Sequence, residues 1–159
     1  MAIEYTLLMK DKKLSDDILL KKIQSMGYSC NCVEQLKRGG VAISLYEQTG
    51  FAVFLYDSDS YPFNGWDSYF LKREFIWKRS LSFRWDKTYS DVEQQYKIML
   101  KIIFELMEEL NEEAVLLGSG SEELCVFRED EAILLNNESG IWGWKHFKDI
   151  IADRDFVYV

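Results

Sequence analysis

Clustered carboxylates are the side chains of this sequence whose types and spacing most clearly favour chemistry. Five glutamates fall within nine residues: Glu105, Glu108, Glu109, Glu112 and Glu113. They occupy the end of the longest predicted helix, where the helix dipole disfavours negative charge by about 0.3–1 kcal/mol per group, so another group should offset this cost. Two interpretations stay open: a solvated helix face that keeps the protein soluble, or an acidic patch that steers a basic partner.

A second concentration of polar and aromatic side chains lies between residues 57 and 70. The candidate binding residues in it are three aspartates and four of its five aromatic residues: Asp57, Asp59, Tyr61, Phe63, Trp66, Asp67 and Tyr69. Because tyrosine and tryptophan are enriched in binding hot spots, these aromatics either pack at the edge of the core or are displayed as anchors for a partner. The run Asp57-Ser58-Asp59 lacks the glycine and terminal glutamate of a calcium loop. We therefore predict no metal site.

Residue types used in catalysis occur without the partners that catalysis requires. His146 is the only histidine, and no nucleophile motif accompanies it. One residue separates Cys30 from Cys32, whereas zinc-binding cysteines usually have roughly two to four residues between them. The run Gly118-Ser119-Gly120-Ser121 precedes a predicted strand, which favours a hairpin turn over a phosphate loop. We predict a protein that is not an enzyme and has no cofactor.

Composition limits the kind of partner and compartment. The chain has 159 residues, is 48% hydrophobic and carries a formal net charge of −8, which argues against general affinity for nucleic acid or anionic membranes and favours a basic protein partner. Its length suits one domain with a substantial core. Three cysteines, no apolar leader and no stretch long enough to cross a bilayer predict a cytoplasmic protein with free thiols.

The elements that position these side chains centre on a strand followed by a long helix. Residues 81–87 alternate apolar and polar types, as in a strand with one buried face. Residues 90–110 follow a helical period, and Ser90 with Glu93 has the spacing of a capping box. The predicted buried face of this helix contains Val92, Tyr96, Met99, Leu100, Ile103, Leu106, Met107 and Leu110.

The remaining segments predict shorter strands and helices around that unit. Ser15 is expected to cap a helix that stops at Gly27, and residues 141–151 are expected to form a short C-terminal helix. Strands are predicted at residues 3–9, 28–35, 41–47, 51–56, 75–87 (in one piece or two), 114–117, 124–128, 132–135 and 156–159, with an irregular stretch at 57–70. We predict a single α+β domain over residues 1–159, with a mainly antiparallel sheet and two principal helices packed on one face.

The order of several short motifs resembles the SitI-type immunity proteins. The resemblance rests on Ile3-Glu4-Tyr5, the strand at 81–87, Met99-Leu100, Ala114-Val115-Leu116-Leu117, Glu122 or Glu123, Arg128, Leu134-Leu135-Asn136 and Ser139-Gly140-Ile141-Trp142. It is strongest over residues 80–142, and the turn at 118–122 departs from the pattern of the family. The resemblance implies a cytoplasmic bacterial protein that is paired with a secreted toxin.

This resemblance and the residue types together predict a function in binding. The chain is expected to neutralise a cognate, basic toxin by stoichiometric occlusion, with aromatic anchors and carboxylates as the contacts. The candidate toxin-binding residues are the seven named at 57–69 and the five glutamates at 105–113. Two alternatives stay open: a small-molecule-binding protein with a pocket lined by Trp66, Trp77, Trp85 or Tyr96, and a non-catalytic subunit or adaptor of a cytoplasmic complex.

Overall fold

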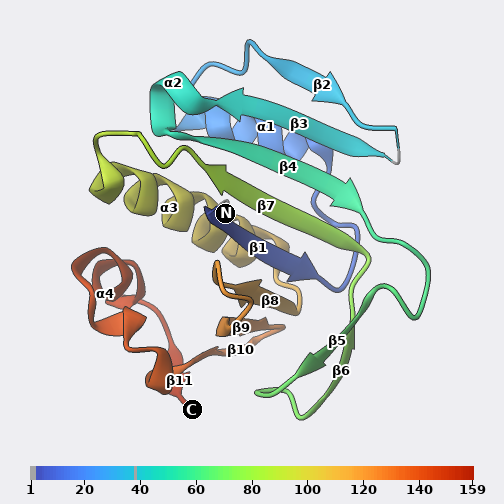
Figure 1. Cartoon of the computed structure of the whole chain (residues 1–159). Helices are drawn as coiled ribbons and strands as arrows, with labels where there is room; N and C mark the ends of the chain where they lie inside the picture. The colour runs from blue at the N-terminus through green and yellow to red at the C-terminus, as the bar shows by residue number, and fades with distance from the viewer. Residues whose placement is uncertain (1–2, 38) are drawn as a thin grey trace.

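One large sheet runs through the molecule. The computed structural model describes residues 3–37 and 39–159 and shows a nine-stranded sheet in the order β11-β10-β9-β8-β1-β7-β4-β3-β2, with a separate two-stranded sheet β5-β6 (Figure 1). The strands are β1 (Ile3–Met9), β2 (Val33–Gln35), β3 (Gly40–Leu45), β4 (Phe51–Asp57), β5 (Gly65–Ser68), β6 (Arg73–Ile76), β7 (Arg79–Trp85), β8 (Ala114–Leu117), β9 (Glu123–Arg128), β10 (Glu131–Leu135) and β11 (Phe156–Tyr158). Neighbouring strands of the large sheet are antiparallel except β10 and β11, which are parallel.

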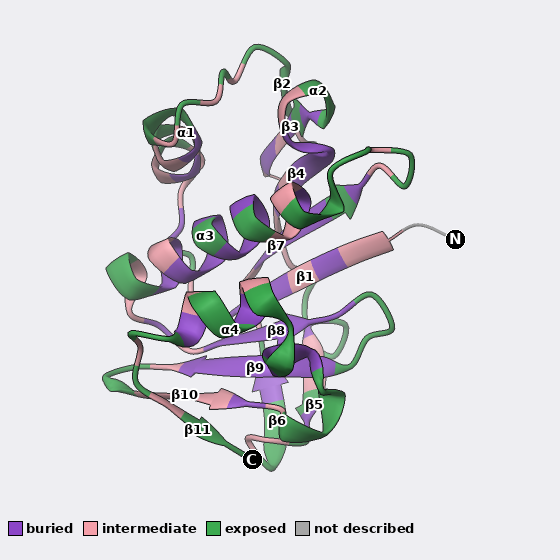
Figure 2. Ribbon diagram, turned by 90° about the vertical axis from the view of Figure 1, so that its left-hand side faces the viewer, coloured by how far each residue is buried: buried purple, intermediate pink, exposed green. Residues whose placement is uncertain are grey.

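The principal helices cover one face of this sheet, as predicted. They are α1 (Asp16–Ser25), α3 (Val92–Leu110) and the short α4 (Lys145–Ile151), and smaller turns are α2 (Tyr46–Thr49), η1 (Asn137–Ser139) and η2 (Ile141–Gly143). Figure 2 shows buried residues on the sides of these helices that face the sheet. The fold is therefore α+β, with one main core between helices and sheet. Among the described residues, no helix is both long and apolar enough to span a membrane.

Strand β1 shows how the sheet separates two layers of side chains. Leu7 and Met9 belong to the main core beneath the helices, whereas Leu8 belongs to a second apolar cluster on the opposite face. Alternate side chains of a strand point to opposite faces, so a continuous apolar run is required where both faces are covered. The run Leu7-Leu8-Met9 meets that requirement at the middle of the sheet.

The cap of α1 is as predicted, whereas the start of α3 differs. Ser15 Oγ accepts a hydrogen bond from the amide of Ile18 at 3.1 Å. For α3 the capping residue is Asp91, whose Oδ1 accepts from the amide of Gln94 at 3.1 Å, and the predicted cap Ser90 is wrong by one residue. Val92 consequently lies in the exposed first turn, with 49% of its surface accessible, instead of the buried face.

A β-hairpin covers part of the second face of the sheet, where the sequence predicted irregular structure. Strand β5 pairs with β6, so the irregular structure predicted for residues 57–70 is wrong over Gly65–Ser68, and also at Asp57, which ends β4. Phe75 of β6 is buried with Leu8, Val115 and Val126 of the main sheet. Of the two alternatives predicted for residues 75–87, the structure shows two strands, β6 and β7. The chain leaves the hairpin before Lys78, whose amide donates to the carbonyl of Met9 at 2.9 Å.

Other boundaries shift at the ends of elements. Strand β3 stops at Leu45 and α2 follows, where the sequence predicted two more strand residues. Strand β2 is shorter than predicted, and all three of its residues are exposed. The predicted helix 141–151 is divided into η2 and α4. The predicted last strand is confirmed as β11, which pairs Val157 with Leu134 at one edge of the sheet.

Candidate protein-binding surface

A lysine from α1 offsets part of the glutamate cluster at the end of α3. Lys22 forms an ion pair with Glu109 and another with Glu105 at 3.5 Å, although only 13% of the Lys22 side chain is exposed. The hydrogen bond to Glu109 raises the pKa of Lys22 above its ordinary value. This lysine supplies the compensating charge that the sequence required near the negative end of the helix dipole.

Two arginines contact other glutamates of the same cluster. Arg154, which follows α4, donates to Glu108 through Nε at 3.0 Å, and Arg73 of β6 pairs with Glu113. The Arg154 guanidinium also lies over the ring of Phe104, with 5.4 Å from Cζ to the ring centroid. Four of the five glutamates therefore hold cations that come from three different parts of the fold.

Glu112 is the exception in this cluster. Only 2% of its surface is accessible, and neither carboxylate oxygen has a hydrogen-bond partner among the described residues. Burial raises the pKa of this carboxyl to about 7, and the charge of Asp11 adds to the effect, while Lys13 and Lys10 act against it. Above neutral pH this carboxyl is therefore charged in the folded state, and its burial lowers the stability of the fold.

The three aspartates predicted near the aromatic stretch lie in different surroundings. Asp57 ends β4 and pairs with Arg79 at 2.7 Å and Lys12 at 3.3 Å. Burial would raise the pKa of Asp57, but the hydrogen bonds and charges of Arg79 and Lys12 outweigh it and hold the pKa below its ordinary value. Asp59 and Asp67 are exposed. Among described residues, no three His, Cys, Asp or Glu side chains are placed to hold a metal ion.

The aromatic residues divide between the two roles that the sequence left open. Tyr61, Phe63 and Tyr69 are exposed, with accessible fractions of 64%, 77% and 77%. Trp66 is half-buried against the second apolar cluster, and its Nε1 donates to Glu123 at 2.9 Å. Three aromatics are thus displayed to solvent, and one attaches the hairpin to the sheet.

Glu123 fixes the end of the hairpin that displays Tyr69. Its buried carboxylate accepts hydrogen bonds from Ser68 Oγ at 3.1 Å and from the amides of Tyr69 at 2.8 Å and Phe70 at 3.5 Å, besides Trp66. Sequence patterns predict no role for Glu123 beyond its place in the family resemblance. Its only local signal is an acidic residue at the start of the apolar strand β9, and its partners lie more than fifty residues away.

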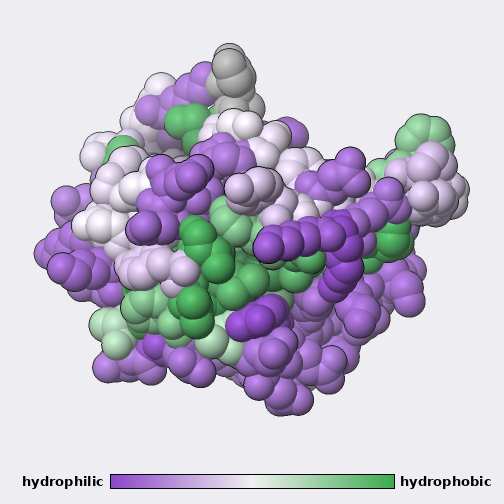
Figure 3. All heavy atoms as spheres, turned by 90° about the horizontal axis from the view of Figure 1, so that it is seen from below, coloured by the Kyte–Doolittle hydropathy of each residue, from purple (hydrophilic) through white to green (hydrophobic). Residues whose placement is uncertain are grey.

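An apolar groove adjoins this end of the hairpin. A groove of about 620 Å³ is lined by Ser68, Tyr69, Phe70, Lys72 and Val159. Val157 is paired with Leu134 and is exposed, and Leu134 packs on the hairpin side of the sheet, so this apolar surface extends along β10 and β11. Figure 3, which views the molecule from below, shows a hydrophobic patch surrounded by hydrophilic residues on this side.

The tryptophans predicted to line a small-molecule pocket do not come together. Trp66 and Trp77 pack in the cluster beneath the hairpin, whereas Trp85 packs in the main core on the other face. There its ring contacts Tyr96, with 4.4 Å between centroids, and Tyr5 at 5.3 Å. These four residues support two separate parts of the core.

The fold and this surface define a class of protein: a small α+β domain that displays aromatic side chains on an anchored hairpin. Comparison with known families gives the assignment. The family model described as SitI3-like matches residues 3–145, so the chain belongs to the SitI3-like family, and the resemblance to SitI-type immunity proteins is confirmed well beyond residues 80–142. No curated protein and no solved structure matches the chain.

Proposed function

We propose that this protein is an immunity protein that binds a cognate toxin in the cytoplasm and neutralises it by stoichiometric occlusion, without acting as an enzyme. Membership of the SitI3-like family supports an immunity role. One observation points to particular residues: Tyr61, Phe63 and Tyr69 are exposed next to β5. Hydrogen bonds from the hairpin to Glu123 attach it to the main sheet.

Large exposed aromatic side chains on a fixed support suit a binding surface. Exposed apolar residues scattered singly need no explanation, but here large exposed rings lie at both ends of one short strand, since Tyr61 and Phe63 precede β5 and Tyr69 follows it. Burial of such rings dominates many interfaces, and little conformational entropy is lost when their support is already ordered. The edge-to-face contact between Tyr69 and Phe70, with centroids 5.2 Å apart, further orders the hairpin end.

The charge of the chain suits a basic partner. Its net charge of −8 attracts positively charged proteins over distances of about one Debye length, roughly 10 Å at 0.1 M salt. Asp67 lies on β5 next to Trp66 and is exposed, so a carboxylate accompanies the aromatic surface. In this proposal the aromatic side chains supply most of the affinity, and the carboxylates orient the toxin and raise the association rate.

Co-expression with the product of the adjacent gene tests the proposed function. The wild-type chain should restore growth to cells that express a toxic neighbour product, and the two proteins should form a complex of fixed stoichiometry. If the product is harmless alone, or equally toxic with and without this chain, the proposal fails.

Substitution of the displayed aromatics tests the proposed surface. The double variant Phe63→Ala/Tyr69→Ala should weaken toxin binding by about 100-fold or more, because hot-spot aromatics commonly contribute about 2 kcal/mol or more each. Calorimetric titration measures the affinity. Tyr46→Ala is the matched control, since Tyr46 is exposed but lies on α2. Equal affinities of both variants and wild type would exclude the hairpin from the interface.

A further inference from the structure

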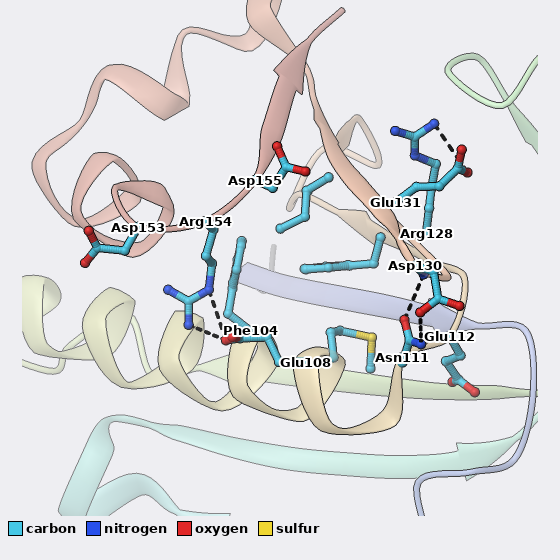
Figure 4. Close-up of a pocket in the computed structure, with 13 residues that line it drawn as sticks. Phe104, Glu108, Asn111, Glu112, Arg128, Asp130, Glu131, Asp153, Arg154 and Asp155 are labelled. Atoms are coloured by element: carbon cyan, nitrogen blue, oxygen red, sulfur yellow. Dashed lines mark hydrogen bonds and ion pairs between the residues drawn. The ribbon is translucent and has the colours of Figure 1, made fainter.

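A pocket with an apolar floor lies at the end of α3 and shares no lining residue with the apolar groove beside the hairpin. It has a volume of about 390 Å³ and lies between the last turns of α3, the β9-β10 hairpin and residues 153–155 (Figure 4). Phe104 and Met107 of α3, Phe127 of β9 and Ile133 of β10 supply its apolar lining. The rings of Phe104 and Phe127 meet edge to face with 5.0 Å between centroids, which makes this floor part of the rigid core.

The rim of the pocket is strongly acidic. Two arginines line it beside six acidic residues, which are Glu108, Glu112, Asp130, Glu131, Asp153 and Asp155. Both arginines are already engaged: Arg128 Nε donates to the carbonyl of Ala132 at 2.8 Å, and Arg154 is held by Glu108. The Asp155 side chain has no hydrogen bond or ion pair with any residue that the structure describes. The excess of negative charge is therefore not compensated within the pocket.

Glu112 adds a further carboxyl group at the α3 end of the pocket. Its carboxylate is almost fully buried, and its oxygens have no partner within the described part of the chain. In Figure 4 it lies near Asn111 and Asp130 at one end of the pocket, and its carboxylate points away from Phe104. A buried carboxylate without a partner is costly, and a nearby cation lowers that cost.

The pocket wall already accepts a guanidinium group. Figure 4 shows Arg154 reaching across Phe104 to Glu108, and the Cζ atom lies 5.4 Å from the ring centroid. The Phe104 ring and the Glu108 carboxylate therefore already bind one cation, the guanidinium of Arg154. Phe127, Met107 and Ile133 offer a further apolar surface next to Asp130 and Asp155.

We propose that this pocket receives a lysine or arginine side chain from the toxin. The aliphatic part of the side chain lies on Phe127 and Ile133, and its charged end lies among Asp130, Asp155 and Glu108. This inference rests on the proposed function for the identity of the partner, and it adds a second contact region with a stated chemistry. Arg73 of β6 pairs with Glu113, two residues beyond Asn111, so the hairpin and the end of α3 adjoin.

A small probe tests the chemistry of the pocket without the toxin. N-acetyl-arginine amide is titrated into the full chain while the methyl NMR signals of Ile133 and Met107 are followed. These signals should move with saturation at millimolar probe, and N-acetyl-citrulline amide, which has nearly the same shape without the charge, should not move them. Equal responses to both probes, or no response to either, would overturn the proposal.

A charge-neutral variant supplies the matched comparison. Asp130→Asn keeps an acceptor for Asn111 Nδ2 and tolerates the positive φ of 54° at this position, so Asp130→Asn/Asp155→Asn should fold normally. This double variant should bind the arginine probe and the toxin with affinities lower by about tenfold or more. Glu34→Gln/Glu47→Gln removes the same charge from exposed positions on β2 and α2 and should leave both affinities within about twofold.

The two proposals fail in different ways. Unchanged toxin affinity in Asp130→Asn/Asp155→Asn would show that the toxin does not use this pocket, while the proposed function stands. If wild type does not bind the product of the adjacent gene but still binds the arginine probe, the proposed function and the toxin assignment fail, and the pocket remains specific for a basic side chain.

Discussion

At the scale of single residues, Glu112 is the side chain that most clearly reduces stability. Its folded-state pKa of about 7 exceeds the ordinary value of 4.5, so the folded state binds the proton more tightly than the unfolded state. The stabilisation by that proton is complete below about pH 4.5 and is lost as pH rises to and beyond 7. Glu112→Gln should therefore raise the free energy of unfolding by about 1–3 kcal/mol at pH 7.5 and by much less at pH 5.

Urea unfolding at pH 5, 6 and 7.5 measures this effect. Glu47→Gln is the control. Glu47 is exposed in α2, so this substitution should change the free energy of unfolding little at any of the three pH values. A difference between Glu112→Gln and wild type that is the same at pH 5 and pH 7.5 would contradict the assignment of the pH dependence to this carboxyl.

At the scale of elements, the β5-β6 hairpin depends on one residue of the main sheet. Glu123→Gln removes a charged acceptor that serves Trp66, Ser68 and two backbone amides, and hydrogen bonds to charged groups contribute about 1.5–3 kcal/mol. Hydrogen exchange at the amides of Tyr69 and Phe70 should accelerate by about 10- to 100-fold, while exchange in β1 and β7 changes little.

The neighbouring glutamate provides the comparison for this prediction. Glu122 is exposed in the β8-β9 turn, so Glu122→Gln should leave exchange in the hairpin unchanged. Toxin affinity should fall in Glu123→Gln and be retained in Glu122→Gln if the hairpin presents the binding aromatics. Slow exchange of the Tyr69 amide in Glu123→Gln would show that the hairpin is ordered without this carboxylate.

Sequence patterns predicted the elements that depend on local signals. Ser15 as a cap, the strand at 3–9 and the helical period through Met99 and Ile103 are all readable from neighbouring residues, and the structure confirms them. The hairpin was missed because β5 and β6 are four residues each and are separated by a turn in which Lys72 has a φ of 57°. Its stability comes from Glu123 and the second cluster, contacts that no local pattern reveals.

The candidate binding residues were predictable as a set but not in their individual roles. Composition located the aromatic stretch, yet burial decides that Trp66 packs inward while Phe63 is displayed. In the same way, the sequence showed that the glutamates needed compensation, but only the fold brings Lys22 to Glu109 and Arg154 to Glu108. Such pairs join residues that are distant in sequence, so spacing does not encode them.

At the scale of the whole molecule, the net charge of −8 should control the rate of association with a basic toxin more than the lifetime of the complex. Glu105 and Glu109 are locally compensated by Lys22, so the long-range field depends on the excess of carboxylates elsewhere, including Asp155 at the pocket rim. The association rate constant should fall by about tenfold or more between 0.05 M and 0.5 M salt, and the dissociation rate constant should change by less than about threefold. Stopped-flow fluorescence and surface-based kinetics measure the two rates. An association rate that does not respond to salt would show that apolar contacts of the hairpin alone determine the encounter.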